Sequence, residues 1–478
     1  MRKRTKIVAT LGPSTDDPET LRQMIGAGLD VARLNFSHGD HEQQKLRLSR
    51  LREVAAHSNR FIGVIGDLQG PKIRIRRFKN SSVKLRVGDS FYIDSSLGAS
   101  EGDQNGVGVA YEDLHKDVDA GDVLLLNDGQ MTLKVARVDG TRIHTTVVIG
   151  GVLSDHKGIN REGGGLSAPA LTDKDRSDIQ FAADMNMDYI AVSFVRSADD
   201  IDEARRLLTA AGGKGAIIAK IERVEALDCI DSIIDASDAI MVARGDLGVE
   251  MGYAELTGIQ KSIIRRTRHK NKVVITATQM MESMITNPIP TRAEVSDVAN
   301  AVMDGTDAVM LSAETAVGSY PVEVISAMNS VCVGAEKHAL TMGRTTHRLD
   351  DRFSAVDEAI AMAVMYTANH LKVRAIIALT ESGSTTLWMS RIRSDIPIYA
   401  FTPHDSTSRR VTLYRGVYPV SFTIQQTDIG LLYRDIFAIL LSKKLVEEGD
   451  LVIFTKGDLS GVSGSTNSMQ IVEVSATI

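Results

Sequence analysis

Short apolar segments alternate with longer amphipathic stretches over most of the chain before residue 340. The apolar segments lie at 6–10, 30–36, 62–68, 188–194, 216–221, 239–245, 273–278 and 308–314. Stretches between them, such as 198–211 and 255–270, carry apolar residues at helical spacing. Alternating strands and helices are typical of a parallel α/β sheet, and eight such units close a barrel. The pattern therefore predicts an α/β fold built on a (β/α)8 TIM barrel.

Two regions depart from this pattern. Between 72 and 167, short alternating runs are separated by Gly-Asp turns and helical periodicity is nearly absent, which predicts a small β-barrel inserted in a barrel loop as a lid. After a polar stretch at 341–352, strands and helices alternate again and predict an open α/β regulatory domain. We therefore expect a barrel domain in two parts, 1–71 and 168–345, a lid domain at 72–167 and a C-terminal domain at 346–478.

Composition narrows the class of protein. Of 478 residues, 43% are hydrophobic and 24% charged, as in an ordinary globular protein. A net charge of −6 argues against a protein that binds nucleic acid. The sequence contains no run of the ~20 apolar residues that a membrane helix needs, so we expect no membrane partner. The apolar stretch behind the basic amino terminus is too short for a signal peptide. Cys229 and Cys332 are the only cysteines in the sequence, and two are too few for a disulfide framework or a four-cysteine zinc site. We therefore expect a cytoplasmic protein.

Polar residues stand at the carboxyl end of every predicted barrel strand. Active sites of such barrels lie at this end, and a purely structural barrel has no reason to collect polar groups there. The residues are Thr10, Arg33, Asn35, Ser37, His38, Asp67, Ser193, Lys220, Glu222, Gly245, Asp246, Thr278, Gln279, Ser312 and Glu314. The pattern predicts an active site.

Lys220, Glu222 and Asp246 suggest the chemistry of this site. Side chains two apart on a strand share a face, so Lys220 and Glu222 should point into one cavity. Two carboxylates suit Mg²⁺ or Mn²⁺, with substrate and water completing the shell, and an ammonium would neutralise a phosphoryl group in transfer. Taken by themselves, these residues are also consistent with a buried ion pair that ties strands together and has no catalytic role.

Three other strand-end residues have both a functional and a structural interpretation. Arg33 offers a planar fork for phosphate oxygens, or pairs with Asp67. Thr278 is suited to passing a proton through water, or to capping a helix over 279–285. Gly245 lets the backbone approach a ligand closely, and amides from there onward would bind a carboxylate if they open a helix.

Seven motifs resemble the pyruvate kinase family, over essentially the full chain. They are RLNFSHG at 33–39, GDLQGPKIR at 66–74, IIAKIE at 217–222, MVARGDLGVE at 241–250, ATQMMESM at 277–284, PTRAE at 290–294 and LSAET at 311–315. Jointly they are far more specific than a single glycine-rich motif. The resemblance implies phosphoryl transfer from phosphoenolpyruvate to ADP, giving pyruvate and ATP in the last step of glycolysis. It also implies an allosteric homotetramer.

The resemblance also implies a role for individual residues. Lys220 would stabilise the migrating phosphoryl group, Arg33 would contact phosphate, and Glu222 and Asp246 would hold the divalent ion. Thr278 would lie near the enolate carbon. Further substrate contacts fall on Ser193, Gly245 and Asp246, and nucleotide contacts on His38, Arg74 and Lys157.

The chain departs from many family members in the region of a monovalent cation. Those members bind K⁺ through groups equivalent to Asn35, Ser37, Asp67 and the carbonyl of Leu68. They carry Glu at the position of Lys72, and Thr-Lys where this chain has Leu68-Gln69. Because the ammonium of Lys72 would supply the missing positive charge, we expect that K⁺ is not required.

The C-terminal domain carries a candidate effector loop. Thr380-Glu-Ser-Gly-Ser-Thr385 follows a predicted strand and opens a helix, which suits a phosphate, although such loops also cap helices with no ligand. The candidate residues are Thr380, Ser382, Gly383, Ser384 and Thr385. Related loops often have Arg at position 384, so one phosphate ligand is missing. We expect a sugar phosphate or a nucleotide monophosphate as effector.

Two other functions share part of this pattern. A lyase or aldolase on a metal-dependent barrel also uses acidic ligands, but it has no need for a lid with basic nucleotide contacts. A metabolite sensor using only the C-terminal domain is disfavoured by Lys220, Glu222, Asp246 and Thr278 at the strand ends.

Overall fold

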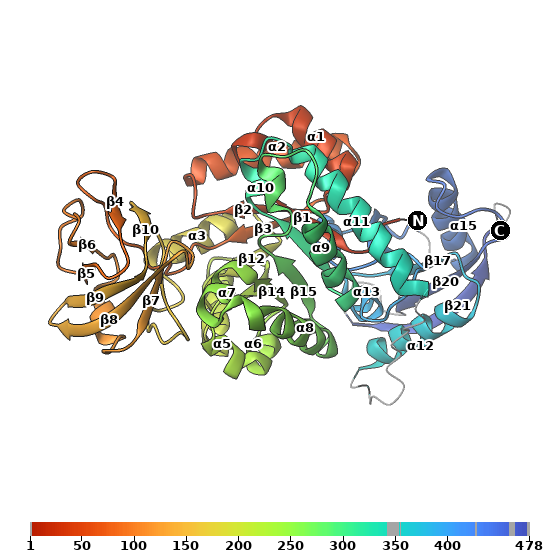
Figure 1. The fold of residues 1–478 in the computed structure, drawn as a ribbon. Helices are drawn as coiled ribbons and strands as arrows, with labels where there is room; N and C mark the ends of the chain where they lie inside the picture. Colours follow the sequence, from red (N-terminus) through yellow and green to blue (C-terminus); the bar gives the residue numbers. More distant parts are fainter. Residues whose placement is uncertain (1, 342–352, 354, 426–427, 458–463, 476–478) are drawn as a thin grey trace. The chain divides into compact units, whose positions relative to one another are not determined.

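The computed structural model describes residues 2–341, 353, 355–425, 428–457 and 464–475 (Figure 1). Its central element is a closed barrel of eight strands in the order β1-β16-β15-β14-β13-β12-β3-β2. The strands are β1 (Lys6–Thr10), β2 (Val31–Asn35), β3 (Gly63–Asp67), β12 (Tyr189–Val192), β13 (Ala216–Ile221), β14 (Ala239–Ala243), β15 (Val273–Ala277) and β16 (Ala308–Leu311). The predicted eight-stranded barrel is confirmed. Several predicted strands were too long, because polar residues at their ends belong to the following loop or helix.

Helices connect the barrel strands. They are η1 (Pro13–Thr15), α1 (Pro18–Ala27), α2 (His41–His57), α3 (Asp173–Asp184), α4 (Ala198–Ala210), α5 (Glu225–Asp228), α6 (Ile230–Ala236), α7 (Arg244–Met251), α8 (Tyr253–His269), η3 (Glu282–Ile285), α9 (Arg292–Asp304), α10 (Ala313–Ala316) and α11 (Pro321–Thr341). Capping boxes start α3 at Thr172 and α9 at Thr291, where each threonine accepts a backbone N–H three residues on. The two predicted helices at 198–211 and 255–270 correspond to α4 and α8.

The regular structure of the segment between β3 and α3 consists of strands apart from one short 3-10 helix. It contains β4 (Ser82–Leu85), β5 (Ser90–Asp94), β6 (Gly106–Gly108), η2 (Glu112–Lys116), β7 (Val123–Leu126), β8 (Met131–Asp139), β9 (Arg142–Ile149), β10 (Gly151–Ser154) and β11 (Ile159–Arg161). Six strands form one sheet in the order β11-β7-β8-β9-β5-β6, and β10 pairs with β4. Alternate residues such as Leu133 and Val135 enter a core of their own.

The C-terminal segment forms a second α/β sheet, of five strands in the order β19-β18-β17-β20-β21. Its elements are α12 (Val356–His370), β17 (Ala375–Leu379), α13 (Ser384–Ser390), β18 (Ile398–Thr402), α14 (Asp405–Val411), β19 (Val417–Ser421), α15 (Ile429–Ser442), β20 (Leu451–Gly457) and β21 (Thr466–Glu473). Helix α15 packs Ile436 and Phe437 against one face of the sheet, and α12 and α13 lie on the other face (Figure 1).

The chain folds as two compact units, each made of several segments. One comprises Met1–Gly66, Asn186–Tyr189 and Thr267–Ile478, and the other Asp67–Met185 and Ile190–Arg266. The inserted β-segment belongs to the second unit and the C-terminal sheet to the first. Within the described residues, the structure contains no helix with the length and apolarity that a membrane crossing requires.

Candidate active site

Lys220 lies at the centre of a buried polar cluster in the second unit. Its Nζ is 3.0 Å from Glu222 Oε1 and 3.2 Å from Asp67 Oδ1, and it donates to Ser193 Oγ at 2.7 Å. All four side chains are buried. The predicted shared face of Lys220 and Glu222 is therefore present. Asp67, which the structural alternative paired with Arg33, is an ion partner of Lys220.

The turn after β3 is fixed against Ser193. The Ser193 hydroxyl donates to the carbonyl of Leu68 at 2.7 Å while it accepts from Lys220. Gly70 has φ +65°, and a Cβ at this position would approach Ser193 Cβ to 2.7 Å. Only glycine fits here without a shift of the backbone. Gly70, within the motif at 66–74, thus lets the turn pack closely against Ser193, which holds Asp67 and Leu68 beside Lys220.

The strained backbone of Phe194 holds the Glu222 carboxylate in place. The amide of Phe194 donates to Glu222 Oε2 at 2.8 Å, and Phe194 has φ +56°, which a bulky residue seldom adopts. Burial raises the pKa of Glu222, Lys220 opposes this shift, and the charges of Asp246 and Asp67 add to it. Three carboxylates therefore interact in this cluster. The sequence places Phe194 at the end of the predicted strand 188–194, but an apolar residue there carries no sign of a left-handed backbone.

Asp246 is paired with a second lysine. It lies in the first turn of α7, so the amides from Gly245 onward do open a helix. Lys72 Nζ is 2.9 Å from Asp246 Oδ1 and 3.8 Å from Asp128 Oδ1. Burial disfavours the charged form of Lys72, but Asp246 and Asp128 outweigh it, so its pKa is raised. Asp128 was also missed, because Asn-Asp-Gly at 127–129 has the composition of an ordinary hairpin turn.

The oxygens of this cluster fit a hard divalent cation. Glu222 and Asp246 are both carboxylates in electrostatic contact, and each has an ammonium beside it that neutralises its charge. Across the described residues, no group of three or more His, Cys, Asp or Glu is arranged to hold a metal ion. A cation held by these two carboxylates would take its remaining ligands from substrate and water.

The remaining strand-end residues belong to the first unit. Arg33 is buried and donates through Nη1 to Thr10 Oγ1 at 2.9 Å. The amide of Ser37 donates to Asn35 Oδ1 at 3.0 Å, and the His38 carbonyl accepts from Gln44 Nε2 at 2.7 Å. The contacts of Ser37 and His38 fix the loop after β2.

The helix predicted over 279–285 is wrong. Thr278 and Gln279 have φ +68° and +53°, and only the short η3 follows. Two successive left-handed residues turn the chain sharply, so Thr278 caps no helix there, and its hydroxyl donates to the Ala277 carbonyl at 2.6 Å. Glu314 closes the turn by accepting the Met281 amide at 3.2 Å.

Two of the three predicted nucleotide contacts lie close together in the inserted segment. Arg74 pairs with Gly158 in an isolated bridge and donates through Nη1 to the His156 carbonyl at 3.0 Å. The carbonyl of Lys157 accepts the Ile75 amide at 2.9 Å. Both basic side chains are half-buried. His38, the third residue, lies in the first unit.

The candidate effector loop connects β17 to α13. Gly383 has φ +86° and precedes the helix, and its amide donates to Thr380 Oγ1 at 2.9 Å. The buried hydroxyl of Thr385 shares a hydrogen bond of 2.7 Å with that of Thr466 on β21. The start of α13 is thus joined to β21, an edge strand of the sheet.

Comparison with known proteins identifies the family. A family model described as "Pyruvate kinase, barrel domain" matches residues 2–325, and one described as "Pyruvate kinase, alpha/beta domain" matches 358–472. The chain belongs to the pyruvate kinase family. It is 54% identical to pyruvate kinase II of Salmonella typhimurium over 476 residues, which cover 99% of each chain. It is also 50% identical to the pyruvate kinase of Haemophilus influenzae, over 98% of this chain and 99% of the relative.

Membership of the pyruvate kinase family fixes the class of enzyme. The chain is a phosphotransferase, and the substrates phosphoenolpyruvate and ADP follow from the family. Pyruvate kinases use a divalent metal, which agrees with the oxygen donors of Glu222 and Asp246.

Proposed function

We propose that the Lys220 cluster transfers the phosphoryl group of phosphoenolpyruvate to ADP. The observation that carries this proposal is a buried ammonium in contact with a hydroxyl and two carboxylates. In such a water-poor site, a fixed positive charge stabilises the migrating phosphoryl group far more than it would in water. Ser193 orients the lysine, and its own bond to the Leu68 carbonyl fixes the direction of that contact.

In this proposal Glu222 and Asp246 hold Mg²⁺ or Mn²⁺. The bound ion neutralises charge on the substrate oxygens. The amide of Phe194 orients the Glu222 carboxylate, and the first turn of α7 orients Asp246. In the structure, Lys220 neutralises Glu222 and Lys72 neutralises Asp246. When the divalent ion takes over this role, both ammonium groups would face the substrate phosphate.

The family resemblance also assigns roles to residues outside the Lys220 cluster. Arg33, oriented by Thr10, contacts phosphate oxygens, and Thr278 passes a proton through water toward the enolate carbon. The amides near Gly245 bind the substrate carboxylate. The nucleotide is bound by His38, Arg74 and Lys157.

A coupled assay for pyruvate, with phosphoenolpyruvate, ADP and Mg²⁺, tests the proposed activity. We expect pyruvate formation that depends on all three. Omission of ADP separates this function from a lyase or aldolase, because those enzymes need no phosphoryl acceptor. Pyruvate released at the same rate without ADP would contradict phosphoryl transfer.

We further propose that a sugar phosphate or nucleotide monophosphate regulates the enzyme through Thr380–Thr385. Fructose 1,6-bisphosphate or AMP should lower the phosphoenolpyruvate concentration needed for half-saturation severalfold. Ser382→Ala with Thr385→Ala should abolish this response, whereas Ser390→Ala at the other end of α13 should keep it. Saturation curves that neither compound shifts would contradict the proposal.

The remaining expectations also stay proposals. They are the domain limits 1–71, 72–167, 168–345 and 346–478, a homotetramer, and a location in the cytoplasm. Sedimentation of the purified chain would test the homotetramer.

A further inference from the structure

The chain leaves the inserted segment through residues 160–167, the return connector. Its middle is Gly163-Gly164-Gly165, whose φ angles are +77°, +78° and +94°. Three successive left-handed glycines carry no side chains that could fix their conformation, and glycine loses more freedom on ordering than any other residue. Contacts from neighbouring elements therefore decide the position of the return connector.

Glu250, a buried residue of α7, joins the return connector to the barrel. Its Oε1 accepts from Asn160 Nδ2 at 3.2 Å, and its carbonyl accepts the Gly163 amide at 2.9 Å. Its Oε2 accepts the Val224 amide at 3.2 Å. Because Val224 follows β13 and α7 follows β14, one side chain links the return connector to the ends of two barrel strands.

Two further side chains hold the later part of the return connector. The Gly165 amide donates to Glu225 Oε1, and Arg223 Nη1 donates to the Leu166 carbonyl at 3.0 Å. These contacts reach backbone groups, which nearly every residue type offers. The bond between Asn160 and Glu250 depends instead on two side chains, so it can be removed from either end.

The start of the return connector is continuous with the predicted nucleotide contacts. Asn160 stands three residues after Lys157. The Ile159 amide donates to the Ile73 carbonyl at 3.0 Å, so the chain entering the inserted segment and the chain leaving it are bonded to each other beside Arg74. A displacement of Asn160 is therefore passed on to Lys157 and Arg74.

Glu250 acts through the hydrogen bonds that it accepts more than through its charge. Burial raises the pKa of Glu250 to about 7, and the charge of Glu225 adds to this shift. The bonds from Asn160 and Val224 oppose it. Charged and neutral forms are therefore both populated near neutral pH. A glutamine should replace Glu250, because the Asn160 amide can turn so that its oxygen accepts from the new NH₂ group.

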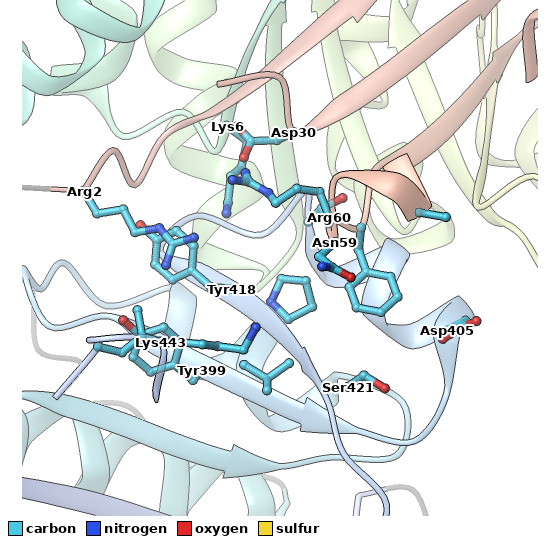
Figure 2. A pocket seen from close by; sticks show the side chains of 16 residues that line it. Arg2, Lys6, Asp30, Asn59, Arg60, Tyr399, Asp405, Tyr418, Ser421 and Lys443 are labelled. Atoms are coloured by element: carbon cyan, nitrogen blue, oxygen red, sulfur yellow. The ribbon is translucent and has the colours of Figure 1, made fainter. Parts of the chain in front are cut away.

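These contacts are independent of a cavity of about 610 Å³ in the first unit. That cavity is lined by residues such as Lys6, Asp30 and Tyr418 (Figure 2). Glu250 and the return connector belong to the second unit. Substitutions at Glu250 therefore leave the wall of the cavity unaltered.

We propose that Glu250 is a positioning residue, which fixes the return connector so that Arg74 and Lys157 are placed to bind the nucleotide. The proposal rests on the nucleotide contacts of the proposed function. Because Glu250 acts through the inserted segment, its loss weakens the binding of ADP. The binding of phosphoenolpyruvate by the Lys220 cluster stays largely unchanged.

Glu250→Ala and Asn160→Ala, made singly and together, remove the two partners of the bond. Glu250→Gln is the conservative variant, and Glu255→Ala in the exposed first turn of α8 is the matched control. Calorimetric titration of the full chain with ADP and Mg²⁺ gives the affinity, and the coupled assay gives kcat and both KM values. Hydrogen exchange reports the amides of the return connector. Thermal unfolding shows which variants are folded, and Asn160→Ala decides the test if Glu250→Ala is not.

Each alanine variant should bind ADP about tenfold more weakly, the loss expected for a buried hydrogen bond. The double variant should bind no more weakly than Glu250→Ala, because both substitutions remove the same contact. KM for ADP should rise in parallel, whereas kcat and KM for phosphoenolpyruvate should stay close to those of the unaltered chain. The amides of the return connector should exchange faster in Glu250→Ala. Glu250→Gln and Glu255→Ala should behave as the unaltered chain does.

Unchanged ADP affinity in the alanine variants would overturn the proposal. An equal rise of both KM values would overturn it as well, since a merely structural role has that result. Unchanged amide exchange in Glu250→Ala would show that Glu250 does not hold the return connector. If the unaltered chain formed no pyruvate, the proposed function would fail, while the calorimetric titration would still decide the role of Glu250.

Discussion

Lys220→Met should lower kcat for pyruvate formation by about three orders of magnitude or more. Methionine keeps most of the length of the side chain but removes the positive charge that contacts Asp67, Glu222 and Ser193 together. The transferring phosphoryl group then lacks its fixed cation. The measurement is the coupled assay for pyruvate at saturating phosphoenolpyruvate, ADP and Mg²⁺.

Two comparisons make the Lys220→Met result specific. Lys214→Met, in the exposed turn before β13, should leave kcat unchanged. Because loss of one partner of a buried ion pair often destabilises a protein by about 3–5 kcal/mol, thermal unfolding must show that the variant is folded at the assay temperature. A folded Lys220→Met enzyme with turnover within tenfold of the unaltered chain would refute the proposed role.

Lys72→Glu should make the enzyme dependent on K⁺. The new carboxylate would stand beside Asp246 and Asp128, within electrostatic reach of Glu222. Repulsion of this kind between partly buried charges amounts to a few kcal/mol, so we expect activity without monovalent cations to fall about a hundredfold. K⁺ should restore it, because the ion replaces the lost ammonium. The measurement is the assay in tetramethylammonium buffer with and without added K⁺.

The unaltered chain should keep its rate when K⁺ is replaced by tetramethylammonium. Lys134→Glu, an exposed charge reversal on β8 of the same inserted segment, should behave as the unaltered chain does. A collapse of the unaltered enzyme in tetramethylammonium would contradict the role of Lys72. A Lys72→Glu enzyme that is fully active without K⁺ would contradict it equally.

The barrel and the centre of its site were predictable because they depend on short-range periodicity. A side-chain period of two along a strand is enough to bring Lys220 and Glu222 to one cavity, and the structure has them 3.0 Å apart. The helix signal of α8 likewise follows from its own residues. These predictions needed no knowledge of which distant segments meet.

Other features depend on backbone conformation or on contacts far apart in sequence. Phe194 and Thr278 adopt left-handed conformations that their residue types disfavour, so surrounding structure decides them. The approach of Asp128 to Lys72 follows from how the inserted segment folds, which no local pattern encodes.

Binding of Mn²⁺ in the presence of phosphoenolpyruvate, followed by electron paramagnetic resonance, tests most directly whether Glu222 and Asp246 form one cation site. Glu222→Gln with Asp246→Asn should weaken Mn²⁺ binding by about a hundredfold or more, since both charged oxygen donors are lost. Glu203→Gln with Asp231→Asn, which alters acids on α4 and α6, should bind the ion as the unaltered chain does. Equal affinity of the unaltered chain and the Glu222/Asp246 variant would contradict the account of the active site.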